Sequence, residues 1–232
     1  TVKREIDHQT GDILGELQGV VKPYRGKYES FTSLPAEGKP QADIIAEISK
    51  IADGESTRWK DGFVSGAVYH GSQEYIEFLN TVYALTSQNN PLHSDLFPSA
   101  SKFESEIVSM TAAMLGSQGT ADDICGAVSS GGTESILLAM KTYRDWARET
   151  KGITRPEIVI PATAHAAFDK TGEYFHIKVY HIPVDSDFRV DVQQVKKAIT
   201  NNTIAIVGSA PSFPHGVIDH LEELSQLALD RH

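Results

Sequence analysis

The sequence predicts an α/β domain with a mostly parallel central sheet, preceded by a helical segment. After residue 116, short apolar runs alternate with amphipathic stretches of about 10–15 residues. This alternation is typical of βαβ units, whose strands pair in parallel and are buried on both faces. Before residue 116, apolar residues recur at helical spacing instead. We therefore expect a helical segment over 1–115 and an α/β domain over 116–232.

Each expected element follows from its own pattern. In the first segment, three helices are expected where apolar residues share one face: 41–52, 72–88 and 99–115. In the second segment, apolar runs predict strands at 124–128, 157–161, 177–184 and 203–208. Amphipathic stretches predict helices at 133–149, 164–175, 191–199 and 221–230. Asp191 begins the third of these helices, because aspartate is a favoured N-cap.

The composition limits the class of function. The chain has 232 residues, and its 31 acidic and 21 basic side chains give a formal charge of −10. This excess of acid argues against a nucleic-acid backbone as the main partner. The single cysteine, Cys125, excludes an internal disulfide and fits a reducing compartment. No run of about 18 apolar residues occurs, so no transmembrane helix is predicted.

The start of the expected helix at 133 has the composition of an anion site. The residues from Ser129 to Ser135 read SSGGTES, with Gly131 and Gly132 directly before a long helix. Backbone N–H groups and the positive end of the helix dipole favour phosphate at such a start. The run lacks the P-loop ending and the dinucleotide glycine spacing, which leaves a single phosphomonoester. A bare helix start capped by Thr133 is an equal alternative.

Two later strand-to-helix junctions carry further candidate side chains. His165 follows the strand at 157–161, where an imidazole either stacks on a flat ligand or caps the next helix. The segment 208–216 is rich in Ser, Pro and Gly and includes Ser209 and His215. Parallel strands bind ligands at their shared carboxyl edge, so three polar junctions in register favour a binding site.

Two upstream segments add polar side chains. The glycine-bounded run 64–71 contains Tyr69, and the non-helical loop 89–98 contains Asn90, His93 and Asp95. No metal site is predicted, because His93 and Asp95 have no third ligand at a telling spacing.

Six segments, in this order, resemble one known enzyme family. They read GAVYHG, NPLHSDLFP, FESEIVSM, SSGGTES, ITRPEIVIPATAHAAFDK and SAPSFPHGVID. From about Trp59 to the end, the chain resembles sphingosine-1-phosphate lyase, a pyridoxal-phosphate enzyme of fold type I in the group that includes glutamate decarboxylase. The resemblance implies an incomplete fold-type I large domain that binds pyridoxal 5'-phosphate, whose ring accepts the electrons released by bond cleavage. It also implies cleavage of the C2–C3 bond of a phosphorylated sphingoid base to a long-chain aldehyde and phosphoethanolamine.

The resemblance further implies roles for individual residues. Gly132 and Thr133 would hold the cofactor phosphate, and His165 would stack on the pyridine ring. Asn90 and Ser209 would also belong to the cofactor site, with His215 nearby.

Substrate recognition and catalysis involve two more residues by the same resemblance. Tyr69 and His93 would face the substrate and its phosphate, and with His165 they are the candidate catalytic residues. The family's Asp against the pyridine nitrogen and its Schiff-base Lys, in a His-Lys dipeptide, have no match here. Lys170 is expected to point away from the helix start. We therefore expect residues 1–232 to be part of a longer protein and to be inactive alone.

Two alternatives stay open. One is a related pyridoxal-phosphate amino-acid decarboxylase similar to glutamate decarboxylase, and the other is a catalytically silent or truncated chain that binds phosphate or a partner. The resemblance implies a homodimer with shared sites and, through a segment outside this chain, a membrane surface as neighbour. The expected location is cytosol-facing, at the endoplasmic reticulum in a eukaryote and cytoplasmic otherwise.

Overall fold

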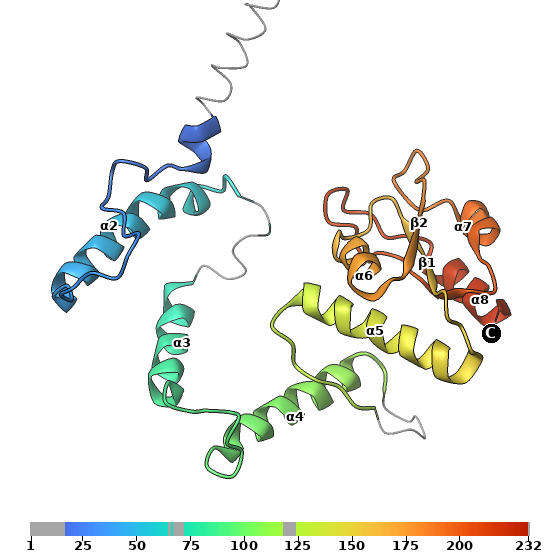
Figure 1. The fold of residues 1–232 in the computed structure, drawn as a ribbon, viewed down its shortest axis with the longest axis horizontal. Helices are drawn as coiled ribbons and strands as arrows, with labels where there is room; N and C mark the ends of the chain where they lie inside the picture. The colour runs from blue at the N-terminus through green and yellow to red at the C-terminus, as the bar shows by residue number, and fades with distance from the viewer. Residues whose placement is uncertain (1–16, 65, 67–71, 118–123, 232) are drawn as a thin grey trace, which may run out of the picture. The chain divides into compact units, whose positions relative to one another are not determined.

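The structure, a computed structural model, describes residues 17–64, 66, 72–117 and 124–231 (Figure 1). The chain forms two compact units that divide between Gln88 and Asn89. The expected domain boundary at 115/116 stays a prediction. Within the described residues, no helix combines the length and the apolar character needed to cross a bilayer.

The first unit contains two of the expected helices. Helix α2 spans Gln41–Lys60 and is eight residues longer than expected at its end, whereas α3 spans Gln73–Thr86. The side chain of Ser72 accepts a hydrogen bond from the Tyr75 amide and caps α3. The four side chains that predicted α3 are 40–59% exposed within this chain: Tyr75, Phe78, Leu79 and Val82.

Helix α4, at Pro98–Met114, begins the regular structure of the second unit. Proline at its first turn is favourable, because the first N–H groups of a helix have no partner within the helix. Its apolar side chains are 49–78% exposed: Phe103, Ile107, Met110 and Met114. The patterns of α3 and α4 thus predicted the helices correctly, but no described residue buries their apolar faces.

The strand expected at 124–128 is wrong. These residues form no regular structure, and Ile124 and Val128 are 52% and 55% exposed. A strand requires a neighbouring backbone, and here the Val128 amide instead donates to the Glu104 carboxylate at 3.1 Å. The segment has the apolar composition of a strand, but no described strand pairs with its backbone.

The remaining elements form the expected α/β alternation. In chain order they are α5 (Gly132–Lys151), β1 (Glu157–Pro161), α6 (Ala167–Phe175), β2 (Lys178–Ile182), α7 (Val192–Ala198), β3 (Thr203–Ile206) and α8 (Leu221–Arg231). The sheet order is β2-β1-β3, and both pairings are parallel. The predicted α/β class is therefore confirmed. Asp191 caps α7 as predicted, because its side chain accepts from the amides of Gln193 and Gln194.

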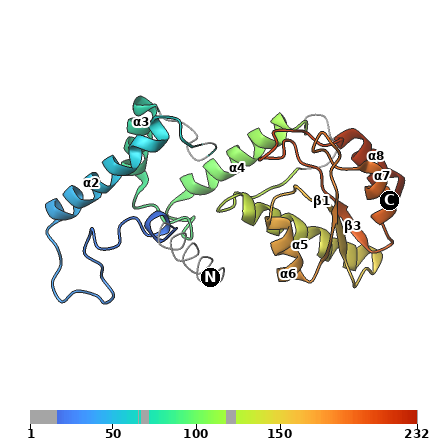
Figure 2. The ribbon, with the colours of Figure 1, turned by 90° about the horizontal axis from the view of Figure 1, so that it is seen from above.

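Helices cover both faces of the sheet, and the central strand β1 is buried on both sides. Ile158 and Ile160 belong to one apolar cluster with Met140 of α5, and Val159 belongs to another with Leu224 of α8. Figure 2 shows α5 and α6 on one side of the sheet and α7 and α8 on the other. Burying each such side chain stabilises the fold by about 1.5–3 kcal/mol. The continuous apolar run of β1 is therefore explained by its central position.

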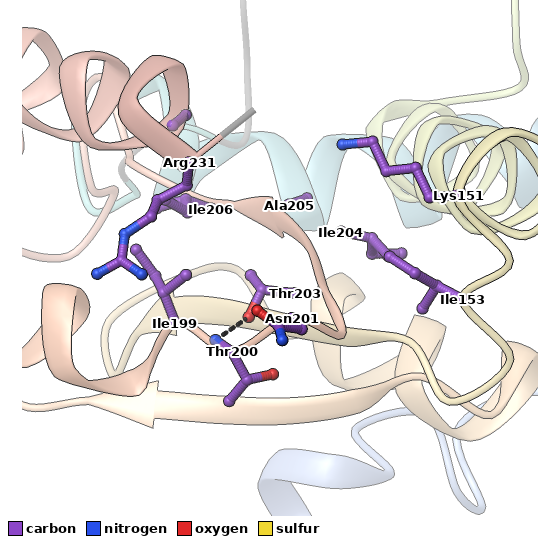
Figure 3. Close-up of a pocket in the computed structure, with 11 residues that line it drawn as sticks. Lys151, Ile153, Ile199, Thr200, Asn201, Thr203, Ile204, Ala205, Ile206 and Arg231 are labelled. Carbon is purple, nitrogen blue, oxygen red and sulfur yellow. Dashed lines mark hydrogen bonds between the residues drawn. The ribbon is translucent and has the colours of Figure 1, made fainter.

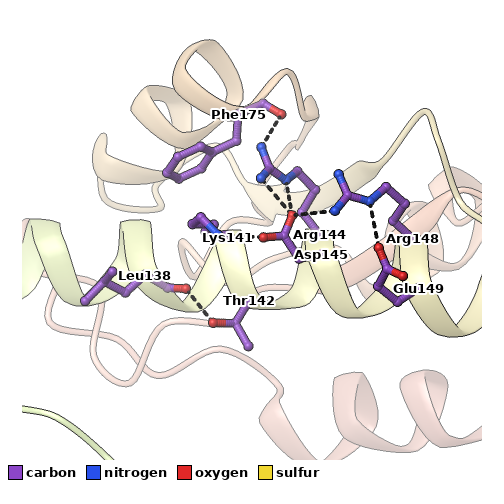
Figure 4. Close-up of polar contacts among 8 residues, drawn as sticks. All are labelled: Leu138, Lys141, Thr142, Arg144, Asp145, Arg148, Glu149 and Phe175. Atoms are coloured by element: carbon purple, nitrogen blue, oxygen red, sulfur yellow. Dashed lines mark hydrogen bonds and ion pairs between the residues drawn. The ribbon is translucent and has the colours of Figure 1, made fainter.

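A cluster of charged side chains joins α5 to the end of α6 (Figure 4). The Asp145 carboxylate lies 2.6 Å from Lys141 Nζ and 2.7 Å from Arg144 Nη2. Arg144 also donates to the Phe175 carbonyl at 3.4 Å and lies over the Phe175 ring. Hydrogen bonds from Lys141 and then Arg144 lower the pKa of Asp145 to about 2.

The three parallel strands bring their following loops to one edge of the sheet. The register pairs Pro161 with Ile182 at the ends of β1 and β2, and β3 runs parallel on the other side of β1. The loops 162–166, 183–191 and 207–220 therefore leave from the same carboxyl edge. In parallel sheets this edge is where ligands bind.

Candidate functional site

Hydrogen bonds hold the turn before α5 in place. The Glu134 carboxylate accepts from the amide and the hydroxyl of Ser130 at 2.6 and 2.5 Å, which closes the turn as the glutamate of a capping box does. These bonds lower the pKa of Glu134, first through the Ser130 hydroxyl and then through its amide. The hydroxyl oxygens of Ser129 and Ser135 are 2.6 Å apart. The turn is therefore built before any ligand binds.

The first amides of α5 stay open in the described structure. Gly131 is the N-cap residue, and no described side chain makes a cap hydrogen bond there. Thr133 therefore does not cap the helix, and the bare-cap alternative is not supported. A Cβ added at Gly131 or Gly132 would meet no atom within 4 Å, and neither glycine has a left-handed φ. Packing among the described residues does not require these glycines, whereas a ligand close to the backbone would.

The His165 side chain bonds to the first turn of the helix that follows β1, whose N-cap residue is Ala166. His165 Nδ1 accepts a hydrogen bond from the Ala167 amide at 3.0 Å, so α6 begins at Ala167 instead of 164 as expected. An accepting Nδ1 places the proton of the neutral ring on Nε2 and fixes the orientation of the ring. The ring itself is exposed. This hydrogen bond to the first residue of α6 leaves the ring face available for stacking, and the role of His165 stays a prediction.

A buried hydroxyl lies two residues before His165. Thr163 Oγ1 is buried and has no hydrogen-bond partner among the described residues. An unsatisfied buried polar group costs about 1–3 kcal/mol, so such groups in native proteins usually have a partner. A polar ligand atom or a water at this junction would supply it.

Ser209 stands at the third junction, directly after the sheet. Its amide donates to a carboxylate oxygen of Asp219 at 2.7 Å, and the residue is half-buried. The His215 ring stacks on Phe188 with centroids 4.6 Å apart, and its Nδ1 lies 3.4 Å from Ser212 Oγ. Ser209 is therefore fixed by its backbone, and His215 by a neighbouring ring.

One apolar cluster joins the three junctions. Ile136 of the first turns of α5, Ala164 after β1 and Val207 after β3 all belong to it or pack against it. Each of these residues stands within four positions of a predicted site residue. The structure therefore brings the start of α5, His165 and Ser209 to the same edge of the sheet.

The loop at 89–98 forms the expected turn. Asn90 Oδ1 accepts from the Leu92 amide at 3.1 Å, and the Asn90 carbonyl accepts from the His93 amide at 3.0 Å. Both side chains are exposed, and within the described residues no hydrogen bond joins them to the three junctions. Their roles stay predictions. Tyr69 lies outside the described residues.

The cavities found among the described residues lie away from these junctions. Figure 3 shows one of about 320 Å³ beside β3, between the ends of α5 and α8, where the Thr200 amide donates to Thr203 Oγ1. None of the described site candidates lines it. Lys170 lines a different cavity with residues of α6 and β2, so it is not placed at the start of α5.

Comparison with known proteins identifies the family. Residues 26–227 match the model of the pyridoxal-dependent decarboxylase conserved domain. The chain belongs to this family. The cofactor class that the resemblance implied is therefore confirmed.

Similar proteins agree with the finer resemblance. The chain is 41% identical to a sphingosine-1-phosphate lyase of Drosophila melanogaster over 98% of its length, and 53% identical to one of Arabidopsis thaliana over 94%. A solved sphingosine-1-phosphate lyase of Burkholderia pseudomallei matches 90% of the chain with a TM-score of 0.85 and 39% identity. The resemblance to this family is confirmed.

These proteins are longer than the chain. It spans 42% and 41% of the two curated relatives and 49% of the solved lyase. A Lactobacillus brevis glutamate decarboxylase matches 89% of the chain and 47% of its own length, with a TM-score of 0.71 and 18% identity, which shows the shared fold alone. The fold-type I class is therefore confirmed.

The described residues fit the phosphate of pyridoxal phosphate. A dianion needs donors in a space free of side chains, and the start of α5 offers open amides beside two glycines at which an added Cβ would meet no atom within 4 Å. The Thr163 hydroxyl, buried without a partner, is consistent with a further polar ligand atom at this edge.

Sequence patterns did not single out Asp219. This carboxylate is 4% exposed and holds the Ser209 amide. The available signal was an acidic residue directly after Val217 and Ile218, in a loop otherwise made of turn residues.

Proposed function

We propose that the whole protein is a pyridoxal-phosphate-dependent lyase. It cleaves the C2–C3 bond of phosphorylated sphingoid bases to a long-chain aldehyde and phosphoethanolamine. The observation that carries the proposal is the clear, uncapped start of α5 in a chain 41–53% identical to sphingosine-1-phosphate lyases. The more distant decarboxylase neighbours support only the coarser family.

The start of α5 anchors the cofactor in this proposal. The amides of Gly132 and Thr133 and the Thr133 hydroxyl donate to the phosphate, and the helix dipole adds favourable potential. Gly132 keeps the approach to these amides free of a side chain. When bound, the cofactor supplies an electron sink for carbon–carbon cleavage.

His165 and Ser209 orient the ring. The hydrogen bond from the Ala167 amide to His165 Nδ1 holds the imidazole plane, so that its exposed face stacks on the pyridine. Ser209 Oγ has no partner among the described residues and donates to the cofactor from the opposite junction. Asn90 belongs to the same cofactor site.

Tyr69 and His93 recognise the substrate phosphate in this proposal. His93 is exposed in the loop before α4, and its backbone is held in a turn that leaves the imidazole available. None of the chain's lysines takes the covalent role, because no His-Lys dipeptide occurs in residues 1–232.

The protein acts as a homodimer with shared sites in this proposal. The support is the exposure of the apolar faces of α3 and α4, whose residues are 40–78% exposed within one chain. Large exposed apolar surfaces mark interaction sites. We further propose a cytosol-facing enzyme, located at the endoplasmic reticulum if the source is eukaryotic.

Product analysis tests the proposed reaction. The whole protein is incubated with pyridoxal phosphate and a phosphorylated sphingoid base, and products are identified by mass spectrometry. Phosphoethanolamine and a long-chain aldehyde in equal amounts are expected. Release of carbon dioxide from glutamate without aldehyde would favour the decarboxylase alternative. A protein that neither binds the cofactor nor forms product would be the silent alternative.

A further inference from the structure

Asp219 is a buried carboxylate in the loop that follows β3. It is 4% exposed, and no ion pair with a cationic side chain is found for it in the described part of the chain. Burying a carboxylate is costly unless its oxygens are hydrogen-bonded. Its two oxygens therefore need hydrogen-bond donors from neighbouring residues.

Both oxygens of Asp219 accept from backbone amides of two different loops. One accepts from Val190 at 2.8 Å, in the loop between β2 and α7, and the other accepts from Ser209 at 2.7 Å. The Asp219 amide returns a hydrogen bond to the Ser209 carbonyl at 3.0 Å. Asp219 thus bonds to both the amide and the carbonyl of Ser209.

A second contact joins the same two loops. Phe188, before Val190, stacks on His215, before Asp219, with their ring planes 20° apart. Both loops leave the carboxyl edge of the sheet, where Val207, two residues before Ser209, and Ala164, next to His165, belong to or pack against one apolar cluster. The carboxylate is therefore the buried link of a two-loop unit at the candidate site.

We propose that Asp219 is a positioning residue that acts on the cofactor through Ser209. It fixes the backbone of the half-buried Ser209 before the cofactor binds. The Ser209 hydroxyl then faces the cofactor without a further loss of conformational entropy on binding. Preorganisation of this kind raises affinity by reducing the entropy lost on binding. The inference rests on the proposed function, because it requires a pyridoxal-phosphate site at this edge.

A double-mutant cycle separates positioning from a purely structural role. The variants are Asp219→Asn, Ser209→Ala and their combination in the whole protein. Asparagine keeps the size, but its nitrogen cannot accept an N–H, so one of the two hydrogen bonds is lost. Asp191→Asn is the control for loss of a carboxylate charge, because Asp191 also accepts from two backbone amides but caps α7 instead of holding Ser209; both amides donate to Oδ1, which asparagine keeps.

Cofactor affinity is the first readout, measured by titration of each cofactor-free protein. Each single variant should weaken binding about tenfold, which corresponds to about 1.4 kcal/mol. The double variant should weaken it by little more than either one, because residues in one network are not additive. Asp191→Asn should bind as the wild type does. Additive losses of about a hundredfold, or unchanged affinity in Asp219→Asn, would overturn the proposal.

Amide hydrogen exchange of the cofactor-free protein is the second readout and does not depend on the proposed function. Asp219→Asn should speed exchange at Val190 and Ser209 and leave β1 unchanged, whereas equal exchange would refute the link between the loops. If Asp219→Asn does not fold, Asp219→Ser replaces it in both measurements. A wild-type protein that does not bind pyridoxal phosphate overturns the proposed function and the positioning role together, while exchange still reports on the loop link itself.

Discussion

Substitution of Gly132 should separate cofactor binding from folding. A valine side chain at Gly132 causes no clash at its Cβ among the described residues, because an added Cβ meets no atom within 4 Å. Valine and glycine differ in helix propensity by less than about 0.5 kcal/mol, so Gly132→Val should fold with nearly unchanged stability. The new side chain nevertheless covers the first amides of α5.

The expected loss of affinity follows from the hydrogen bonds that are covered. A charge-assisted hydrogen bond contributes about 1.5–3 kcal/mol, so losing one weakens cofactor binding about 10- to 100-fold. Thr133→Ala removes a hydroxyl donor and should fall at the lower end of this range. The measurements are cofactor titration and urea unfolding of the cofactor-free whole protein.

Thr150→Val is the matched control. It places valine in the same helix, 18 residues from Gly132, which is about 27 Å along the axis at 1.5 Å per residue. Thr150 donates only to the Trp146 carbonyl within its own helix, so affinity and stability should both stay near the wild-type values. Unchanged affinity in Gly132→Val, or equal loss in Thr150→Val, would refute the placement of the phosphate.

Further predictions concern the fold and the reaction. Asp145→Asn should flatten the pH dependence of the free energy of unfolding between about pH 4 and pH 2. Asp145 stabilises the fold above its ordinary pKa of 3.8, and this contribution is lost as pH falls through about 2. Urea unfolding across that pH range checks the prediction, and an unchanged slope in acid would contradict it. Ile160→Ala should cost about 2–5 kcal/mol in the same assay, because the side chain is buried in the central strand, and a loss below about 1 kcal/mol would argue against the sheet described. His93→Ala should raise KM for the phosphorylated substrate without changing cofactor affinity; equal KM in steady-state kinetics would remove His93 from substrate recognition. Borohydride reduction of the cofactor-loaded whole protein, followed by peptide mass analysis, should label no lysine of residues 1–232, and a pyridoxyl-lysine inside this range would show the assignment to be wrong.

Elements were predictable from the sequence where one pattern determines the structure. The run at 157–161 gave β1 with its bounds, because a strand covered on both faces has consecutive apolar residues, here Ile158–Ile160. Ile124–Val128 has a similar composition but is exposed, because composition does not reveal whether a neighbouring strand is present. Helix α6 begins later than its apolar pattern, at Ala167, whose amide donates to His165 Nδ1 instead of to a backbone carbonyl.

The candidate site was predictable where it depends on local chain geometry. The run SSGGTES predicted the start of α5, because the residues that form a helix start are consecutive in the sequence. Asp219 was missed because its partners, Val190 and Ser209, are 29 and 10 residues away in the chain. Contacts of this kind depend on how two loops meet and leave no periodic signal in the sequence.

A crystal structure of the whole protein with pyridoxal phosphate tests the central claim most directly. We expect the cofactor phosphate at the start of α5, with its oxygens about 2.7–3.2 Å from the amides of Gly132 and Thr133 and the His165 ring stacked on the pyridine. A phosphate bound elsewhere, with the first amides of α5 bonded only to water, would contradict it.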